Sequence, residues 1–129
     1  MRYLYAHNFR GFTNTIIPLE SVNFFVGENS TGKTSILALI NLLNSPNFWF
    51  NNQFNSPDHE FGGFKDIISA NVSESDLFSI GIIHKRQTEE QSSENWNGIL
   101  LTFQEKEGLP SLAYVGRQSG HSSFLEFKV

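Results

Sequence analysis

The chain has 129 residues, a length typical of one domain. Its 39% hydrophobic and 14% aromatic content is enough to build a core, in which the 13 phenylalanines should dominate. The absence of cysteine excludes a disulfide framework and a thiolate metal site. A formal net charge of −4 gives no compositional sign of nucleic-acid binding. There is no apolar run of membrane-spanning length and no secretory signal pattern, so we expect a cytoplasmic globular protein.

The first 43 residues predict a hairpin, a third strand and a helix. Met1–Phe12 predicts a first strand, and Ile16–Leu19 predicts a second strand at a sheet edge because it contains a proline. Val22–Val26 is a β-branched and aromatic run, typical of a strand buried on both faces. From Lys33 the apolar period becomes helical, which predicts a largely buried helix that ends near Pro46.

The remaining sequence predicts two further parts. Residues 44–76 form an insertion and connector, in which the Asn- and Pro-rich stretch Asn44–Gly63 predicts an irregular loop and Phe64–Ser69 a short helix or turn. Residues 77–129 predict an antiparallel β-subdomain. Its candidate strands are Leu77–His84, Gly98–Gln104, Leu112–Val115 and Phe124–Val129. Because the sequence stops inside the last of these, we expect the subdomain to be truncated at its C-terminus.

One motif predicts a chemical function. Residues 27–34, Gly-Glu-Asn-Ser-Thr-Gly-Lys-Thr, match G-x-x-x-x-G-K-[ST] between a predicted strand and a predicted helix. Gly27 and Gly32 let the backbone approach a polyphosphate, while the loop amides and the helix N-terminus converge on its oxygens. Lys33 can reach the β- and γ-phosphates, and the Thr34 hydroxyl can ligate Mg²⁺. The alternative is a glycine-rich turn that binds nothing.

The motif lies within a longer family resemblance. Asn8-Phe9-Arg10-Gly11-Phe12, followed by Val-Asn-Phe-Phe-Val and Gly-Glu-Asn-Ser-Thr-Gly-Lys-Thr-Ser, resembles the N-terminus of ABC-type ATPases of the SMC/RecF/OLD group. These proteins open with a strand that ends in an NFR-like turn and continue to a Walker A loop. The resemblance covers roughly residues 1–43. The stretch Gly62-Gly63-Phe64-Lys65-Asp66-Ile67-Ile68 also resembles a G-x-F-x-D segment of OLD-like and related AAA-labelled ATPases.

The resemblance implies an α/β fold class, the N-terminal lobe of an ABC/SMC-like P-loop NTPase with an antiparallel β-subdomain. It implies ATP and Mg²⁺ as ligands, and it places Arg10 near the phosphates and Asn29 near the γ-phosphate. For Arg10 the alternative is a solvated turn residue. The predicted nucleotide-binding residues are Arg10, Gly27, Asn29, Ser30, Thr31, Gly32, Lys33, Thr34 and Ser35, with Thr34 on the nucleotide-bound Mg²⁺.

The same resemblance implies partners and a biological setting. The expected partners are the remainder of the same polypeptide or a second ATPase subunit, a nuclease, and DNA. The expected setting is DNA repair, DNA processing or antiphage defence, where ATP drives dimerisation. These expectations come from the resemblance alone.

The parts needed for hydrolysis are not evident. A Walker B acidic residue should end a second hydrophobic strand. Ile99–Glu105 is the best match, but Thr102 interrupts it and Gln104 stands where aspartate is needed, so an ordinary amphipathic strand is the better interpretation of Glu105. The sequence has no LSGGQ-like signature, and nothing selects among the switch candidates Gln87, Gln91, Gln104 and Gln118. We expect ATP binding without efficient hydrolysis by this chain alone.

Two other functions stay open. A stand-alone P-loop kinase or GTPase is disfavoured because the sequence lacks an N-K-x-D guanine motif and an arginine-rich lid. A non-hydrolysing nucleotide-binding interaction module would use the aromatic loop Phe48–Phe61 as its partner surface, which predicts self-association. Metal binding by protein ligands is disfavoured because His7, His59, His84 and His121 show no paired-ligand spacing.

Overall fold

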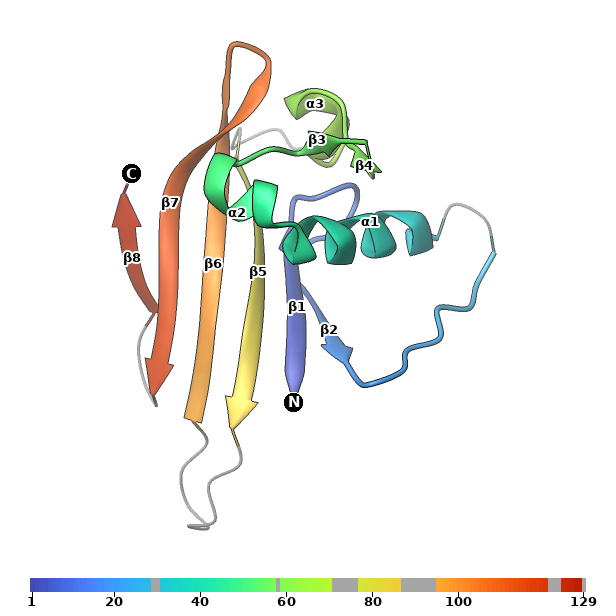
Figure 1. Cartoon of the computed structure of the whole chain (residues 1–129), viewed down its shortest axis with the longest axis vertical. Coiled ribbons are helices and arrows are strands. Elements are labelled where there is room, and N and C mark those ends of the chain that lie inside the picture. Colours follow the sequence, from blue (N-terminus) through green and yellow to red (C-terminus); the bar gives the residue numbers. More distant parts are fainter. Residues whose placement is uncertain (29–30, 58, 71–76, 87–94, 121–123, 129) are drawn as a thin grey trace.

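The computed structural model describes residues 1–28, 31–57, 59–70, 77–86, 95–120 and 124–128 (Figure 1). Its centre is a six-stranded sheet of order β2-β1-β5-β6-β7-β8, in which every neighbouring pair is antiparallel. The strands of this sheet are β1 (Arg2–His7), β2 (Thr15–Leu19), β5 (Leu77–Arg86), β6 (Asn95–Lys106), β7 (Leu109–Gly120) and β8 (Phe124–Lys128). The other elements are helices α1 (Lys33–Asn44), α2 (Pro46–Asn51) and α3 (Phe64–Ile67), and the short paired strands β3 (Asn55–Ser56) and β4 (His59–Glu60).

The predicted hairpins are confirmed, and several strands are longer than expected. Strand β2 pairs only with β1 and therefore forms a sheet edge, the position expected for its proline. Strands β6 and β7 meet at Glu107 and Gly108, which both have positive φ, as a tight two-residue hairpin turn requires. Pairing of β5 with β6 continues to Arg86 and Asn95, so polar positions predicted as connections are strand. Ladder hydrogen bonds outweigh local polarity there.

The strand predicted at Val22–Val26 is wrong. Residues 20–28 form neither helix nor strand, and Val22, Phe24 and Val26 are 67%, 86% and 91% exposed. A β-branched run becomes a buried strand only where neighbouring strands accept its hydrogen bonds and cover its faces. The described residues contain no parallel pairing at all, so the parallel P-loop sheet in the predicted fold class is not shown. The structure shows a mixed α/β chain with an antiparallel sheet.

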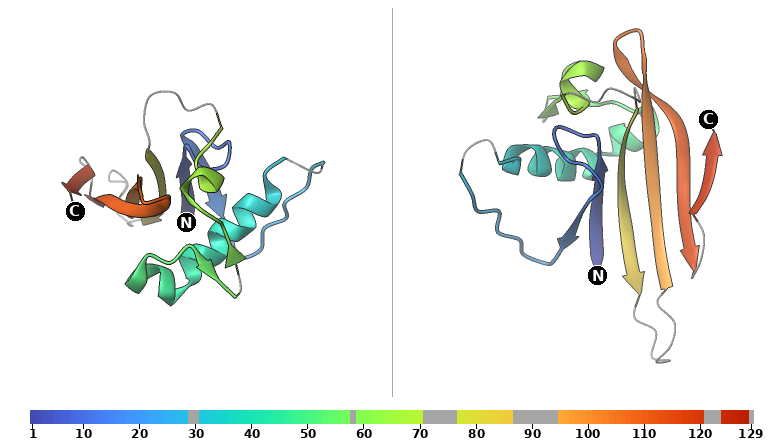
Figure 2. Two further views of the ribbon diagram at one scale, coloured as in Figure 1. Left: turned by 90° about the horizontal axis from the view of Figure 1, so that it is seen from above. Right: turned by 180° about the vertical axis from the view of Figure 1, so that it is seen from behind.

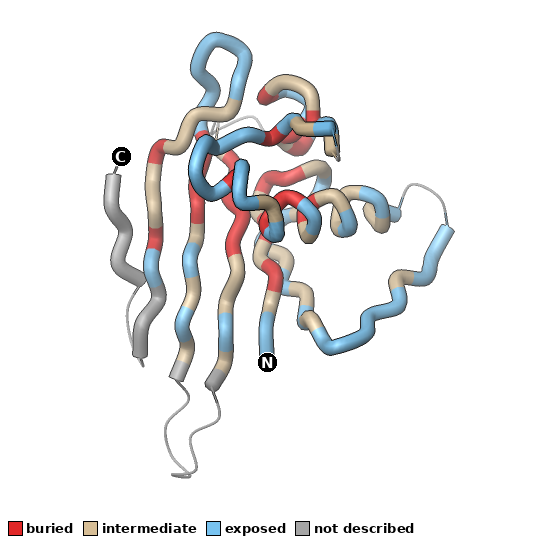
Figure 3. The backbone as a smooth tube through the Cα atoms, viewed as in Figure 1, coloured by how far each residue is buried: buried red, intermediate tan, exposed pale blue. Residues whose placement is uncertain are grey.

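Helices α1 and α2 lie across one face of the sheet (Figure 2). The predicted α1 helix and its end before Pro46 are confirmed. Its burial is partial: Leu39 and Leu42 are buried, whereas Leu37 is half-exposed. Figure 3 shows the buried positions gathered where the helices meet the central strands. The largest fully buried side chains include Leu4, Phe9, Leu39, Leu42, Phe48, Phe61, Ile67, Phe78, Ile80 and Phe103. None of the helices in the described part of the chain is long and apolar enough to cross a membrane.

The irregular loop predicted at Asn44–Gly63 is also wrong. This segment forms α2 and the β3–β4 pair, and it supplies Phe48, Phe54 and Phe61 to the core. Phe54 packs edge-on against Phe48 and Phe103, with ring centroids 5.2 and 4.9 Å apart. Of its aromatic side chains only Trp49 and Phe50 are exposed, so the aromatic partner surface Phe48–Phe61 does not exist as predicted. The segment orders because its rings fill the space between the helices and the sheet.

The sheet joins parts that are distant in the sequence. Strand β1, from residues 1–43, pairs with β5, from residues 77–129. The short helix predicted at Phe64–Ser69 is confirmed as α3. The division into residues 1–43, 44–76 and 77–129 stays a prediction. The arrangement brings the β1–β2 turn close to the start of α1, where the motif lies.

Candidate nucleotide-binding site

Helix α1 begins at the second glycine of the motif. Gly32 is its N-cap, with φ 90° and ψ 3°, a left-handed conformation that favours glycine. A Cβ at this position would lie 2.6 Å from Cζ of Phe12. Backbone conformation and the neighbouring ring therefore both require glycine here.

The amides at the start of α1 are available to an anion. The first N–H groups of any helix lack acceptors within that helix. Gly32 has no side chain to cap them, and the first turn of α1 carries no acidic residue. The first helical hydrogen bond here runs from the Ile36 amide to the Gly32 carbonyl, at 3.0 Å. The preceding amides and the positive end of the helix dipole together favour a bound phosphate.

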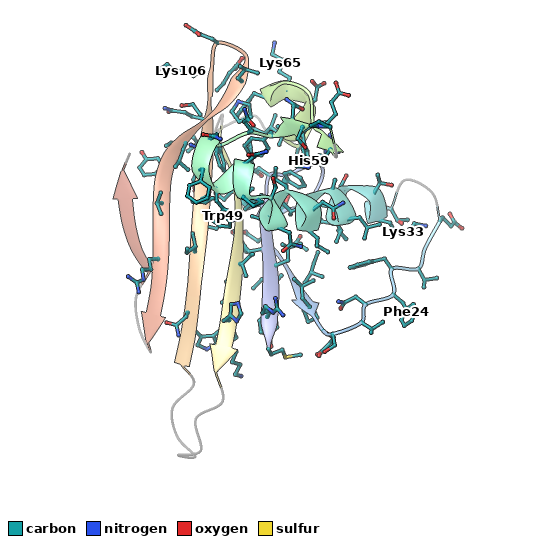
Figure 4. All side chains as sticks on the ribbon, in the orientation of Figure 1. Phe24, Lys33, Trp49, His59, Lys65 and Lys106 are labelled. Carbon is teal, nitrogen blue, oxygen red and sulfur yellow. The ribbon has the colours of Figure 1, made fainter. Side chains whose placement is uncertain are left out.

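A pocket of ≈ 400 Å³ faces these amides. Its lining comes from the β1–β2 turn and from the start of α1, namely Arg10, Gly11, Phe12, Thr31, Gly32, Lys33, Thr34 and Ser35. Lys33 is labelled in Figure 4, at the start of α1. Its ammonium group donates a hydrogen bond to the Gly27 carbonyl, and Thr31 Oγ1 donates to the Glu28 carbonyl at 2.8 Å. A phosphate oxygen would offer Lys33 a charged and stronger acceptor than that carbonyl.

Arg10 brings a second cation to the pocket. It has a left-handed backbone with φ 43°, which is uncommon for a residue with a side chain. Its amide donates to the Ile67 carbonyl at 2.9 Å. In the side chain, Nε donates to the Asp66 carbonyl and Nη2 to the Phe61 carbonyl, each at 3.3 Å. Arg10 is thus a half-buried, anchored residue, and the alternative of a freely solvated turn residue does not fit these contacts.

Most of the predicted site residues lie together, but their nucleotide-binding roles stay predictions. The pocket unites Arg10 with Thr31, Gly32, Lys33, Thr34 and Ser35. Gly27 lies on the adjoining segment, where a Cβ would come 2.9 Å from Thr31 Oγ1. The predicted positions Asn29 and Ser30 lie outside the described residues.

The candidates for hydrolysis do not converge on the pocket. No carboxylate belongs to the described residues that line it. Gln104 and Glu105 are exposed on β6, opposite Ser111 and Pro110 of β7. Of the switch candidates, Gln87 and Gln91 lie outside the described residues.

Two functional candidates escaped the sequence reasoning. Phe12 lines the pocket and packs on Gly32, and Phe61 lies beneath the Arg10 guanidinium, 4.8 Å from its Cζ. Phe12 belongs to the Asn8–Phe12 stretch, but no spacing rule marked its side chain. Phe61 immediately precedes the Gly62–Ile68 stretch, and only the fold brings it to Arg10.

A larger groove of ≈ 460 Å³ lies beside α1, away from the motif residues. Apolar residues of the sheet and of α1 contribute to it, among them Leu4, Leu19, Ile40 and Leu43. Ser21 and Asn23, from the extended segment, also line it. It lacks the cations and glycines of the motif, so we place the nucleotide in the smaller pocket.

The geometry agrees with the comparison of this sequence with known proteins. A family described as the AAA ATPase domain matches residues 1–107. The chain belongs to the AAA ATPase domain family. Membership in this ATPase family implies ATP binding, which is consistent with a pocket built around the motif lysine. Neither the curated proteins nor the solved structures gave a match.

Proposed function

We propose that this member of the AAA ATPase domain family is the ATP-binding lobe of an SMC/RecF/OLD-like ATPase. Its ligand is ATP as the Mg²⁺ complex, bound between the start of α1 and the β1–β2 turn. The observation that carries the proposal is the convergence of Lys33 and Arg10, from separate segments, on one pocket that also contains the uncapped amides of α1. Two cations and a helix N-terminus are suited to a polyphosphate.

The residues present also fit a nucleotide-bound magnesium ion. Thr34 lines the pocket and is exposed, so its hydroxyl is accessible to a cation carried by the phosphates. Mg²⁺ in phosphate sites usually takes few protein ligands and keeps several waters. Thr34 is therefore sufficient as the ligand that this lobe contributes.

We propose that efficient hydrolysis needs residues from elsewhere. A P-loop enzyme uses an acidic residue to hold the metal and another group to orient the attacking water. The described lining of the pocket has hydroxyls and cations but no carboxylate. A second ATPase subunit, or further sequence of the same polypeptide, would supply the missing groups.

The extended segment supports such a partner. Val22, Phe24 and Val26 are mostly exposed, and the apolar groove beside α1 adjoins the same segment. Leaving several large apolar side chains in water is unfavourable by about 25 cal/mol per Å² of apolar surface. We propose that partner strands pair with residues 22–26 and cover these side chains. Roles in DNA repair, DNA processing or antiphage defence, with DNA or a nuclease as partner, follow from the proposed group.

MgATP binding measured by calorimetry tests the proposed function. We expect binding by the purified chain and a loss of about 10- to 100-fold in affinity for Lys33→Ala, the effect of removing a charge-assisted hydrogen bond. Lys106→Ala, which removes an exposed lysine at the end of β6, is the matched control and should bind normally. The proposal fails if the wild type does not bind MgATP, or if Lys33→Ala binds as tightly as the control.

A turnover assay on the same protein tests the incomplete-site part of the proposal. We expect no efficient ATP hydrolysis by the chain alone, because the described pocket lining lacks a carboxylate. Turnover at ordinary enzyme rates that disappears in Lys33→Ala would contradict that part while leaving ATP binding intact.

A further inference from the structure

The Arg10 guanidinium is held by one short segment of the chain. Its Cζ lies 4.8 Å from the centroid of the Phe61 ring, within range of a cation–π interaction. Nη2 donates to the Phe61 carbonyl and Nε to the Asp66 carbonyl. Three contacts therefore restrain a side chain that has many rotamers when it is free.

Phe61 is itself firmly placed. It is 2% exposed, and its ring lies 6.0 Å from the rings of both Phe9 and Phe54. Its amide donates to Asn55 Oδ1 at 2.7 Å. Because ring and backbone are both fixed, Phe61 offers the guanidinium a rigid surface rather than a mobile one.

The backbone around Arg10 is tied to the same part of the chain. The Ser69 amide donates to the Asn8 carbonyl at 2.8 Å, and the Gly11 amide donates to Ser69 Oγ at 2.7 Å. Together with the bond from the Arg10 amide to Ile67, these contacts fix the β1–β2 turn against residues 61–69. The turn and its arginine therefore move with this segment.

We propose that Phe61 is a positioning residue for the nucleotide pocket and acts through Arg10. Arg10 Nη1 makes no hydrogen bond with the residues that the structure describes, while Nε and Nη2 are anchored. Phe61 thereby presents Nη1 to a phosphate oxygen with little entropy left to lose on binding. This inference rests on the proposed ATP-binding function and assigns a further residue to that site.

Phe54 provides the matched control. It is as buried as Phe61, at 3% exposure, and belongs to the same aromatic cluster. Its ring contacts are with other phenylalanines, and its side chain does not line the phosphate pocket. Loss of either ring should weaken the core, but only loss of Phe61 should reach Arg10.

A double-mutant cycle between Phe61 and Arg10 tests the inference. The variants are Phe61→Leu, Arg10→Gln, their combination and Phe54→Leu, and the probes are MgATP and inorganic tripolyphosphate. We expect Phe61→Leu to weaken both probes by about three- to tenfold, and Phe54→Leu by less than about twofold. In the Arg10→Gln background, Phe61→Leu should cause no further loss, because the residue that it positions has been removed.

Independent effects would overturn the inference. If the losses from Phe61→Leu and Arg10→Gln multiply, or if Phe54→Leu matches Phe61→Leu, Phe61 only supports the core. If the wild type binds neither probe, the proposed function fails and this inference with it. Wild-type binding that depends on Lys33, with a multiplicative cycle, overturns the positioning role alone.

A measurement on the wild type covers the case in which Phe61→Leu does not fold. The Arg10 Nε–H signal in nitrogen-edited NMR should be slow to exchange before ligand is added, and it should shift when MgATP binds. A rapidly exchanging Nε–H, or a signal that MgATP leaves unchanged, would also contradict the inference. Phe61→Met serves as a second variant, since it keeps most of the volume and removes the ring face.

Discussion

Two apolar segments of this chain have opposite fates. Residues 44–63 are rich in Asn and Pro, yet they supply buried rings to the core. Residues 22–26 have the composition of a buried strand, yet they extend into solvent (Figure 1). Burial in this molecule thus depends on the surfaces that a segment meets and not on its own hydropathy.

The difference has a physical basis. The first segment packs against the α1 helix and against β5 and β6, where Phe54 meets the rings of Phe78 and Phe103. The second segment meets no strand among the described residues, so its backbone has no ladder to join. A strand gains stability from its hydrogen-bonded neighbours, whereas an aromatic ring gains it from any well-packed apolar surface.

The largest expected effect is at the centre of the aromatic segment. Phe54→Ala should lower the free energy of unfolding by about 3–5 kcal/mol, because it removes a ring that packs against four others and leaves a cavity. Urea unfolding followed by circular dichroism measures this. A loss below about 1 kcal/mol would mean that the segment is not packed as described.

An intermediate effect is expected where the same segment bends back. Asn55 Oδ1 accepts hydrogen bonds from the amides of Phe61 and Gly62, and Asn55 Nδ2 donates to the Gly62 carbonyl. Asn55→Ala should lower the free energy of unfolding by about 1–3 kcal/mol, since it leaves these backbone groups unpaired. Asn51→Ala, an exposed asparagine at the end of α2, is the control and should stay within about 0.5 kcal/mol of wild type.

The smallest effect on stability is expected in the extended segment. Phe24 is 86% exposed, so Phe24→Ser should change the free energy of unfolding by less than about 0.5 kcal/mol. The same variant should reduce self-association at high concentration, measured by sedimentation velocity, because it removes an uncovered ring. A large loss of stability would show that residues 22–26 are buried in solution and would remove the contrast between the two segments.

The candidate site could be predicted in part. The motif spacing predicted Gly27, Gly32, Lys33 and Thr34, because a phosphate-binding loop is local in sequence. The resemblance added Arg10, and the structure brings it to the same pocket. Phe12 and Phe61 escaped prediction, since their positions depend on how the β1–β2 turn meets the start of α1 and residues 61–69.

Local order along the chain was determined by the sequence itself. Hairpins, the α1 helix with its end before Pro46, and the glycine at the helix start all follow from short-range rules of backbone conformation. Only the tertiary structure decided which apolar segments are covered and which ring supports Arg10. Such choices depend on contacts between residues far apart in the chain, as when Phe61 meets Arg10, and no local pattern encodes those contacts.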